Sequence, residues 1–85
     1  MEAGDPRELS RLRWFCRRGM KELDVMLSRY LDEQWPQAPQ SERAAFARLL
    51  DCQDPELWDW LTGRSQPGEK DLAHVVSRIR ESNNG

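Results

Sequence analysis

Apolar side chains recur every three or four residues along most of this 85-residue chain, which is the spacing of one face of an α-helix. No segment alternates apolar and polar residues for long, and no Asn-Gly or Asp-Gly pair joins two apolar runs, as a β-hairpin would require. Glycine and proline interrupt the helical spacing and divide it into five short segments. The sequence therefore predicts an all-α fold of five helices.

Capping residues mark the ends of the expected helices. The starts are marked by Asp5-Pro6, Ser41 and Asp54-Pro55, and the stops by Gly19 and Gly63. The five expected helices span residues 5–19, 20–34, 41–50, 54–63 and a final segment that follows the loop 64–68. The stretch WPQAPQ, residues 35–40, contains two prolines and is expected to be a linker.

The apolar stripes of these helices predict one hydrophobic core. Its expected members are Leu9, Leu12, Cys16, Met20, Leu23, Leu27, Tyr30, Leu31, Ala45, Phe46, Leu49, Leu50, Leu57, Trp60, Leu61, Leu72, Val75, Val76 and Ile79. At about 100° per residue, Trp14 falls nearly opposite that stripe and is expected to be at least partly exposed. Because one core can absorb every stripe, we expect a single compact domain over residues 1–85, a monomer, and flexible ends at residues 1–5 and 82–85.

The two cysteines and the absence of long apolar runs indicate where such a chain would function. Cys16 and Cys52 have no CxxC partner and no histidine nearby in sequence, so we expect two reduced, partly buried thiols in a cytosol-like redox environment. No apolar run approaches the roughly 18 residues of a membrane span. The first ten residues, MEAGDPRELS, are acidic and polar, unlike a signal peptide. We expect no membrane insertion and a bacterial-type cytoplasmic location.

The sequence contains little that indicates catalysis. His74 is the only histidine, and its amphipathic helix makes a surface position the expected one. Cys16, Cys52 and His74 lack the local spacing of zinc ligands, and neither a GxGxxG nor a GxxxxGKS/T loop is present. Helix caps and solvent-facing positions account for the acids Asp51, Asp54, Glu56 and Asp59. We therefore expect no enzyme activity, no catalytic residues and no metal site.

Positive charge is concentrated near the N-terminus. Residues 7–21 contain five arginines and one lysine against a single glutamate, which is a net charge of +5, whereas the remainder of the chain sums to −7. The protein as a whole has a net charge of −2. A basic pole on an acidic body indicates an anionic ligand or an acidic partner surface.

Within this segment, the stretch RWFCRRGMKELD has the features of a binding site. Gly19 at a helix end brings backbone N–H groups near the surface with no Cβ in the way. Arg18 can present a planar fork of donors to a carboxylate or phosphate. Glu22 lies in the first turn of the next helix, where it can orient Arg18 or Lys21. An exposed Trp14 adds an aromatic anchor of the kind enriched at interfaces.

Together with FARLLDCQDPELWDWLTG at residues 46–63, this stretch resembles the SdhE family, the flavinylation factors of succinate dehydrogenase. The likeness covers roughly residues 7–80, in order and at matching spacing. An RGxxE core alone is a weak signal. It becomes specific when it is extended to the string CRRGMxELD and joined to the later pattern LL-x-C-x-D-P-x-L-x-x-W-L at residues 49–61.

The resemblance implies a five-helix assembly chaperone with no catalytic activity and no stably bound cofactor. Family members bind the flavoprotein subunit of succinate dehydrogenase, and in bacteria also that of fumarate reductase, and they promote covalent attachment of FAD to a histidine of that subunit. The residues expected to bind this partner are Arg18, Gly19, Glu22, Met20, Lys21, Trp14 and Arg11. The first five form the RGxxE motif, and the last two are expected to contact the surrounding client surface.

Three other functions stay open on the sequence alone. Two short helices joined at a glycine are similar to a helix-turn-helix module, although a pI near 5.4 argues against nucleic acid as a partner. A second alternative is delivery of free FAD, with Arg18 and a helix N-terminus holding the pyrophosphate, but no phosphate-binding loop supports it. A third, an antitoxin-like interaction module, has been attached to this family by name, and no residue here speaks for it.

Overall fold

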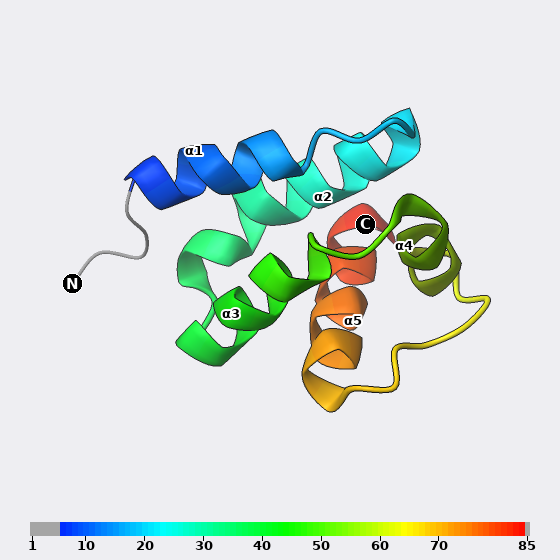
Figure 1. Ribbon diagram of the computed structural model, residues 1–85. Coiled ribbons are helices and arrows are strands. Elements are labelled where there is room, and N and C mark those ends of the chain that lie inside the picture. The colour runs from blue at the N-terminus through cyan, green and yellow to red at the C-terminus, as the bar shows by residue number, and fades with distance from the viewer. Residues whose placement is uncertain (1–5, 85) are drawn as a thin grey trace.

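The computed structural model describes residues 6–84, and within them it contains five α-helices, one short 3-10 helix and no strand. In chain order the elements are α1 (Pro6–Phe15), α2 (Lys21–Glu33), η1 (Trp35–Gln37), α3 (Gln40–Leu49), α4 (Asp54–Leu61) and α5 (Lys70–Asn84) (Figure 1). The prediction of an all-α fold with five helices is confirmed.

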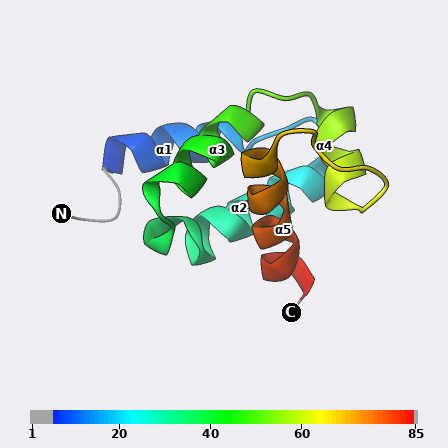
Figure 2. The same ribbon diagram turned by 90° about the horizontal axis from the view of Figure 1, so that it is seen from below.

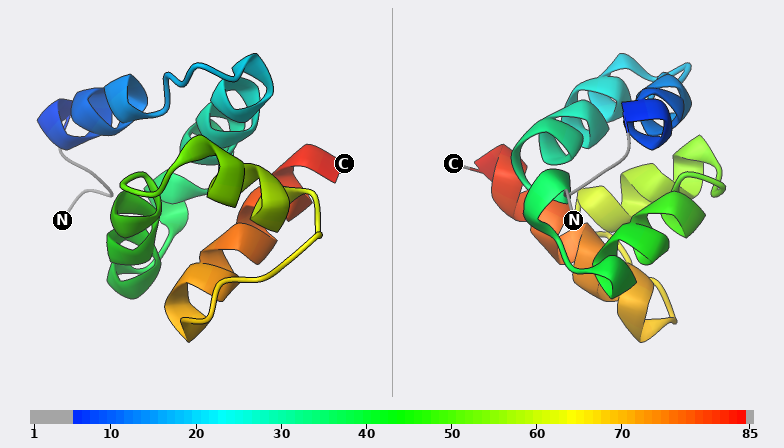
Figure 3. Two further views of the ribbon diagram at one scale, coloured as in Figure 1. Left: turned by 45° about the vertical axis from the view of Figure 1, so that its right-hand side comes forward. Right: turned by 90° about the vertical axis from the view of Figure 1, so that its left-hand side faces the viewer.

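Helices α1 and α2 lie side by side and run in opposite directions, because the chain reverses in the turn between them (Figures 1 and 3). Helix α5 is at the centre of the fold and packs against α2, α3 and α4. In the view from below, α5 crosses α2, with α3 on one side of it and α4 on the other (Figure 2). Helix α1, by contrast, packs mainly along α2, so its position depends strongly on the turn that follows it.

The buried apolar side chains form one cluster to which all five helices contribute. Its members are Leu12, Cys16, Leu23, Leu27, Tyr30, Leu31, Trp35, Ala45, Phe46, Leu49, Leu50, Leu57, Leu61, Val75, Val76 and Ile79. Four predicted core residues, Leu9, Met20, Trp60 and Leu72, are only partly buried and pack against the edge of the cluster. The prediction of one core built from helical stripes is therefore confirmed.

Trp35 is a core residue that the sequence assigns to the expected linker, residues 35–40. Its side chain is only 1% exposed, and it begins the single 3-10 turn η1. Pro36 stands at the start of that turn, and the guanidinium of Arg43 lies over the indole ring at 4.6 Å. The segment does connect α2 to α3 as the linker prediction states, but Trp35 enters the core, because proline marks a break in a helix and not the exposure of the residue before it.

The two helices in the middle of the chain begin earlier than their predicted caps. Ser41 is expected to cap the third helix, yet it lies inside α3. Gln53, rather than Asp54, is the N-cap of α4, and it forms a capping box with Glu56. The capping signals thus identify each helix start but misplace it by one or two residues.

The C-terminal segment, residues 82–85, is expected to fray, but α5 continues through position 84. The Asn83 side-chain amide donates to the backbone oxygen of Ile79 at 2.9 Å and to that of Met26 at 3.2 Å, which ties the last turn to α2. The expectation that residues 82–85 fray therefore stays a prediction, with helix described through position 84. The flexible segment and helix cap expected within residues 1–5 lie outside the described residues.

The core also holds a buried carboxylate. Glu42 of α3 is only 4% exposed, and the Tyr30 hydroxyl of α2 donates a hydrogen bond of 2.6 Å to its Oε2. From α5, Nε2 of the exposed residue His74 lies 3.0 Å from Oε1, and Nε of Arg78 lies 3.7 Å from Oε2. Because these partners replace the water lost on burial, the carboxylate is tolerated and joins three helices. The predicted surface position of His74 is confirmed.

Replacing Tyr30 with phenylalanine tests this buried network. The Tyr30→Phe variant leaves Glu42 without its shortest hydrogen bond, and we expect the free energy of unfolding in urea to fall by ~1–3 kcal/mol. Burial and then the hydrogen bond to Glu42 raise the pKa of Tyr30 in the folded protein. The neutral phenol therefore contributes stability below pH ~10 that is lost at higher pH. We expect a steeper alkaline loss of stability in the wild type than in the variant, and equal slopes would contradict this assignment.

The two thiols give a second test of the core. Cys16 has no exposed surface, which is deeper than expected, and Cys52 is partly buried as predicted. Burial raises the pKa of Cys16 to about 12 and also raises the pKa of Cys52. Because the thiolate is the reactive form, we expect iodoacetamide near pH ~8 to modify Cys52 first and Cys16 only in denaturant. Peptide mass spectrometry measures the order, and prompt labelling of Cys16 in the folded protein would argue against this packing.

Candidate partner-binding site

The stretch RWFCRRGMKELD forms the end of α1, the turn after it and the start of α2. The first helix ends just before Cys16, rather than at Gly19 as predicted. Cys16 is fully buried and anchors one side of the turn, while Met20 is the N-cap of α2 and packs against the edge of the core. We call residues 17–20 the corner.

Arg18 points into the protein rather than toward solvent, and its side chain is only 13% exposed. Its Nη2 donates to the backbone oxygen of Leu50 at 2.5 Å, and its Nη1 donates to that of Cys52 at 3.1 Å. The same Nη1 lies 3.4 Å from Oδ1 of Asp54. The planar fork expected from the sequence is thus formed, but its acceptors belong to the connection between α3 and α4.

A second acid fixes the main chain of the corner. The backbone N–H of Arg18 donates to Oδ1 of Asp24 at 2.8 Å. This carboxylate takes the place of the carbonyl that a longer first helix would have supplied, which explains why α1 ends early. Within the described part of the chain, the acids that hold Arg18 are Asp24 and Asp54, whereas Glu22 is expected to orient Arg18 or Lys21. Glu22 instead lies exposed in the first turn of α2.

Gly19 lies on the exposed side of the corner, but its backbone does not need a glycine. The glycine with a positive φ among the described residues is Gly63, at 84°, which follows α4 as the predicted stop. A Cβ placed on Gly19 would lie 3.8 Å from Oδ2 of Asp54, an ordinary van der Waals contact. A small side chain at Gly19 is therefore compatible with the fold, and a larger one would extend from the surface.

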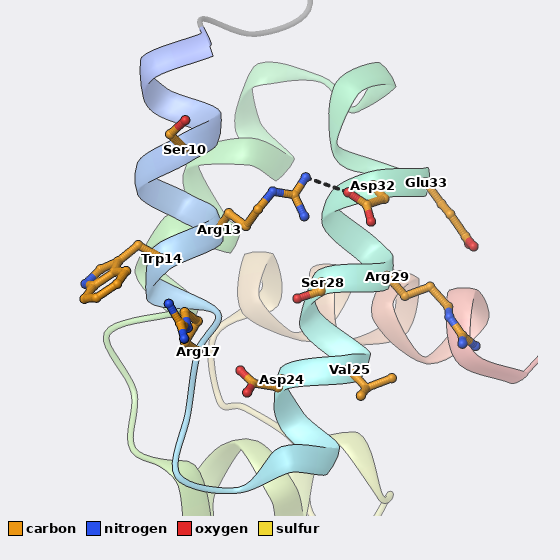
Figure 4. A pocket seen from close by; sticks show the side chains of 10 residues that line it. All are labelled: Ser10, Arg13, Trp14, Arg17, Asp24, Val25, Ser28, Arg29, Asp32 and Glu33. Carbon is orange, nitrogen blue, oxygen red and sulfur yellow. Dashed lines mark hydrogen bonds and ion pairs between the residues drawn. The ribbon is translucent and has the colours of Figure 1, made fainter.

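Trp14 is 64% exposed on α1, so the exposure predicted from helical geometry is confirmed. The guanidinium of Arg17 lies 5.2 Å from the centre of its ring, which is a cation–π contact. Both residues line a groove of about 780 Å³ between α1 and α2 (Figure 4). An ion pair of 2.6 Å between Arg13 and Asp32 bridges this groove, and the Trp14 side chain points away from α2 (Figure 4).

The predicted partner-binding residues divide into two groups. Those that are exposed are Arg11, Trp14, Gly19, Lys21 and Glu22. The other two, Arg18 and Met20, are partly buried. The exposed group lies on α1, on the corner and in the first turn of α2, and the buried pair holds the corner against the body of the protein.

The sequence did not reveal three residues that shape this site. From the sequence, Arg17 is only one of several cations in residues 7–21, yet in the structure its guanidinium lies over the ring of Trp14. The sequence predicts no role for Asp24, and it predicts only a helix cap for Asp54. No sequence spacing shows that residues 18 and 54 meet, because their contact depends on how α3 and α4 pack.

The arrangement provides contacts for binding: an aromatic side chain, a glycine backbone and charges of both signs. Among residues 6–84, no group of three or more His, Cys, Asp or Glu side chains is placed to hold a metal ion. The helices of that same region are too short or too polar for any of them to span a bilayer.

Comparison with known proteins identifies the family. Residues 10–83 match the family model described as flavinator of succinate dehydrogenase. The chain is 46% identical to the FAD assembly factor SdhE of Xylella fastidiosa over 76 aligned residues. The alignment covers 89% of this chain and 78% of that protein. It is 49% identical over 70 residues to the factor of the same name in Methylococcus capsulatus, with coverage of 82% and 84%. For the Coxiella burnetii factor, the identity is 36% over 77 residues, with coverage of 91% and 94%. The resemblance found in the sequence is thus confirmed, and this chain belongs to the family of succinate dehydrogenase flavinators.

Proposed function

We propose that this protein is an assembly chaperone that binds the flavoprotein subunit of succinate dehydrogenase and promotes covalent attachment of FAD to a histidine of that subunit. Family membership over residues 10–83 supports this function, as do relatives named FAD assembly factors. The structural observation that carries it is the corner, which exposes Gly19 while internal contacts of Arg18 hold it in place.

Such a helper needs no acid, base or nucleophile of its own, because the flavin and the client histidine can supply the chemistry. Its contribution is to hold the parts of the client in a reactive arrangement around the cofactor. The thiols agree with this role, since burial raises the pKa of Cys16 and of Cys52 and so disfavours the nucleophilic thiolate. We accordingly propose that the protein is not itself an enzyme.

We assign the client-binding surface to α1, the corner and the first turn of α2. Trp14 supplies an exposed aromatic anchor. Gly19 allows close approach of the client to the backbone of the corner. Lys21 and Glu22 add one charge of each sign beside it, and Arg11 contributes a further cation from α1.

We further propose a second client, an oligomeric state and a cellular location for the protein. The flavoprotein subunit of fumarate reductase is a second client, and the protein acts as a monomer. It works in a bacterial-type cytoplasm, does not enter the membrane and does not hold FAD stably. Nucleic acid is not a partner, because the protein is acidic, with a sequence pI near 5.4, and an acidic protein has little electrostatic attraction for nucleic-acid phosphates.

Two substitutions of Gly19 test the assigned surface. The Gly19→Arg variant places a long side chain on the exposed corner, and we expect it to abolish assisted flavinylation without loss of helicity, since the backbone φ is not positive there. The Gly19→Ala variant is the matched control, because its added Cβ makes only an ordinary contact with Asp54. In-gel flavin fluorescence of apo flavoprotein subunit mixed with FAD measures activity, and circular dichroism measures helicity. A Gly19→Arg protein with wild-type activity and client affinity would refute the assignment.

Titration of the isolated protein with FAD separates chaperoning from cofactor delivery. Because the guanidinium of Arg18 is occupied by acceptors inside the chain, we expect no saturable binding of free FAD in the micromolar range. Fluorescence quenching of the flavin or calorimetry provides the measurement. Micromolar saturation would favour delivery and would contradict the client-scaffolding role.

A further inference from the structure

The side chain of Arg18 joins the two stretches of sequence that carry the family resemblance. Arg18 belongs to the first stretch, RWFCRRGMKELD. Its acceptors, the carbonyls of Leu50 and Cys52 and the carboxylate of Asp54, all belong to the second, residues 46–63. The proposed client surface uses the first stretch together with Arg11 of α1, so it leaves the second stretch without a role.

We propose that Arg18 is a positioning residue and that Asp24 and Asp54 are its partners in this role. Together they hold the corner in the conformation that the client binds, while the client itself contacts the exposed residues around Gly19. This inference rests on the proposed function. It assigns no catalytic task to the three side chains and no direct client contact to the guanidinium.

The geometry explains why arginine suits this position. Leu50 and Cys52 lie just beyond the last residue of α3, where carbonyls no longer have a following helical turn to bond with. A guanidinium presents several donors in a rigid plane and can bond both carbonyls at once, as Arg18 does at 2.5 and 3.1 Å. A lysine ammonium is a single point of charge and cannot reproduce this fork.

The same contacts make a direct role of the guanidinium in client binding unfavourable. The Arg18 side chain is only 13% exposed. Its guanidinium would therefore have to break its hydrogen bonds with both carbonyls and its contact with Asp54 before it could reach a partner. Those partly buried carbonyls would then lose their donor, which costs free energy to the extent that water cannot replace it. The exposed residues nearby can contact a client without any such rearrangement.

Asp24 and Asp54 support the corner from two sides. Asp24 accepts the backbone N–H of Arg18 at 2.8 Å and so fixes the main chain just before Gly19. Asp54 reaches the guanidinium with Oδ1, while its Oδ2 lies 3.8 Å from the position of a Cβ on Gly19. The corner is therefore held through both its main chain and its side chain, and a client meets a preformed surface.

Three variants and one control test the inference. Arg18→Lys keeps the charge but loses the fork, and Asp24→Ala removes the acceptor of the Arg18 amide. Asp24→Asn keeps an acceptor oxygen and is the conservative rescue. The control, Glu81→Ala, removes an exposed acid that pairs with Arg78 at 2.9 Å on α5, away from the corner.

Two measurements are made on each folded protein, after circular dichroism and a thermal melt have shown that it is folded at the assay temperature. The first is amide hydrogen exchange by NMR in the free protein, where Arg18→Lys and Asp24→Ala are expected to speed exchange in residues 18–20 about tenfold. The second is the Kd for the apo flavoprotein subunit of succinate dehydrogenase, which is expected to rise about tenfold for the same two variants. Asp24→Asn and Glu81→Ala are expected to stay within about twofold of wild type in both.

Faster exchange together with a weaker Kd, rescued by Asp24→Asn, supports the positioning role. Faster exchange with an unchanged Kd overturns it, and so does a wild-type Kd for Arg18→Lys. A weakened Kd with unchanged exchange also overturns it, since the client would then read the side chains directly. If the wild-type protein fails to bind the subunit at all, the proposed function fails and this inference fails with it. That result is distinct from the others, because the exchange data need no client.

Discussion

Burial of the Arg18 guanidinium is the constraint on which the placement of the corner depends. Removing such a cation from water is costly unless acceptors inside the protein replace the lost hydration. The acceptors here are two carbonyls and a carboxylate that exist in the right place only when α3 ends and α4 begins as they do. The turn between α1 and α2 and the connection between α3 and α4 are therefore formed together. Helix α1, which packs mainly along α2, gains through this contact a second link to the body of the protein.

Pairing inside the chain also reduces the positive charge that the N-terminal segment presents to a partner. The net charge of +5 in residues 7–21 suggests a strongly basic surface. In the folded protein, however, Arg13 pairs with Asp32 and Arg18 pairs with Asp54, while Arg17 lies over the ring of Trp14. The surface left for a partner has an exposed aromatic ring and charges of both signs. In the proposed client surface, shape and apolar contact therefore matter beside charge, since part of the positive charge is paired inside the chain.

Helical periodicity predicted the five helices and nearly all of the core, because burial of one helix face is a local property of the sequence. Burial that depends on the packing of neighbouring elements is not visible in this pattern. Glu42 is charged and would be assigned to the surface, yet it is buried because Tyr30 and two side chains of α5 surround it. Trp35 follows the end of a helix and precedes a proline, and it enters the core only because η1 turns it inward. For Arg18, the sequence revealed an important residue but not the direction in which it points.

The proposed chaperone role works through the arrangement that the protein imposes on its client, and a rigid binding surface suits that role. Two polar centres provide this rigidity. The buried carboxylate of Glu42 joins α2, α3 and α5, and the contacts of Arg18 fasten the corner to the ends of α3 and α4. The first centre ties the C-terminal half of α2 to α3, and the second ties the corner to the residues just after α3, so α2 and the corner are linked to the same part of the fold. In the proposed function, a preformed surface leaves little ordering to be done on binding, so that more of the contact energy can hold the client's own domains in place.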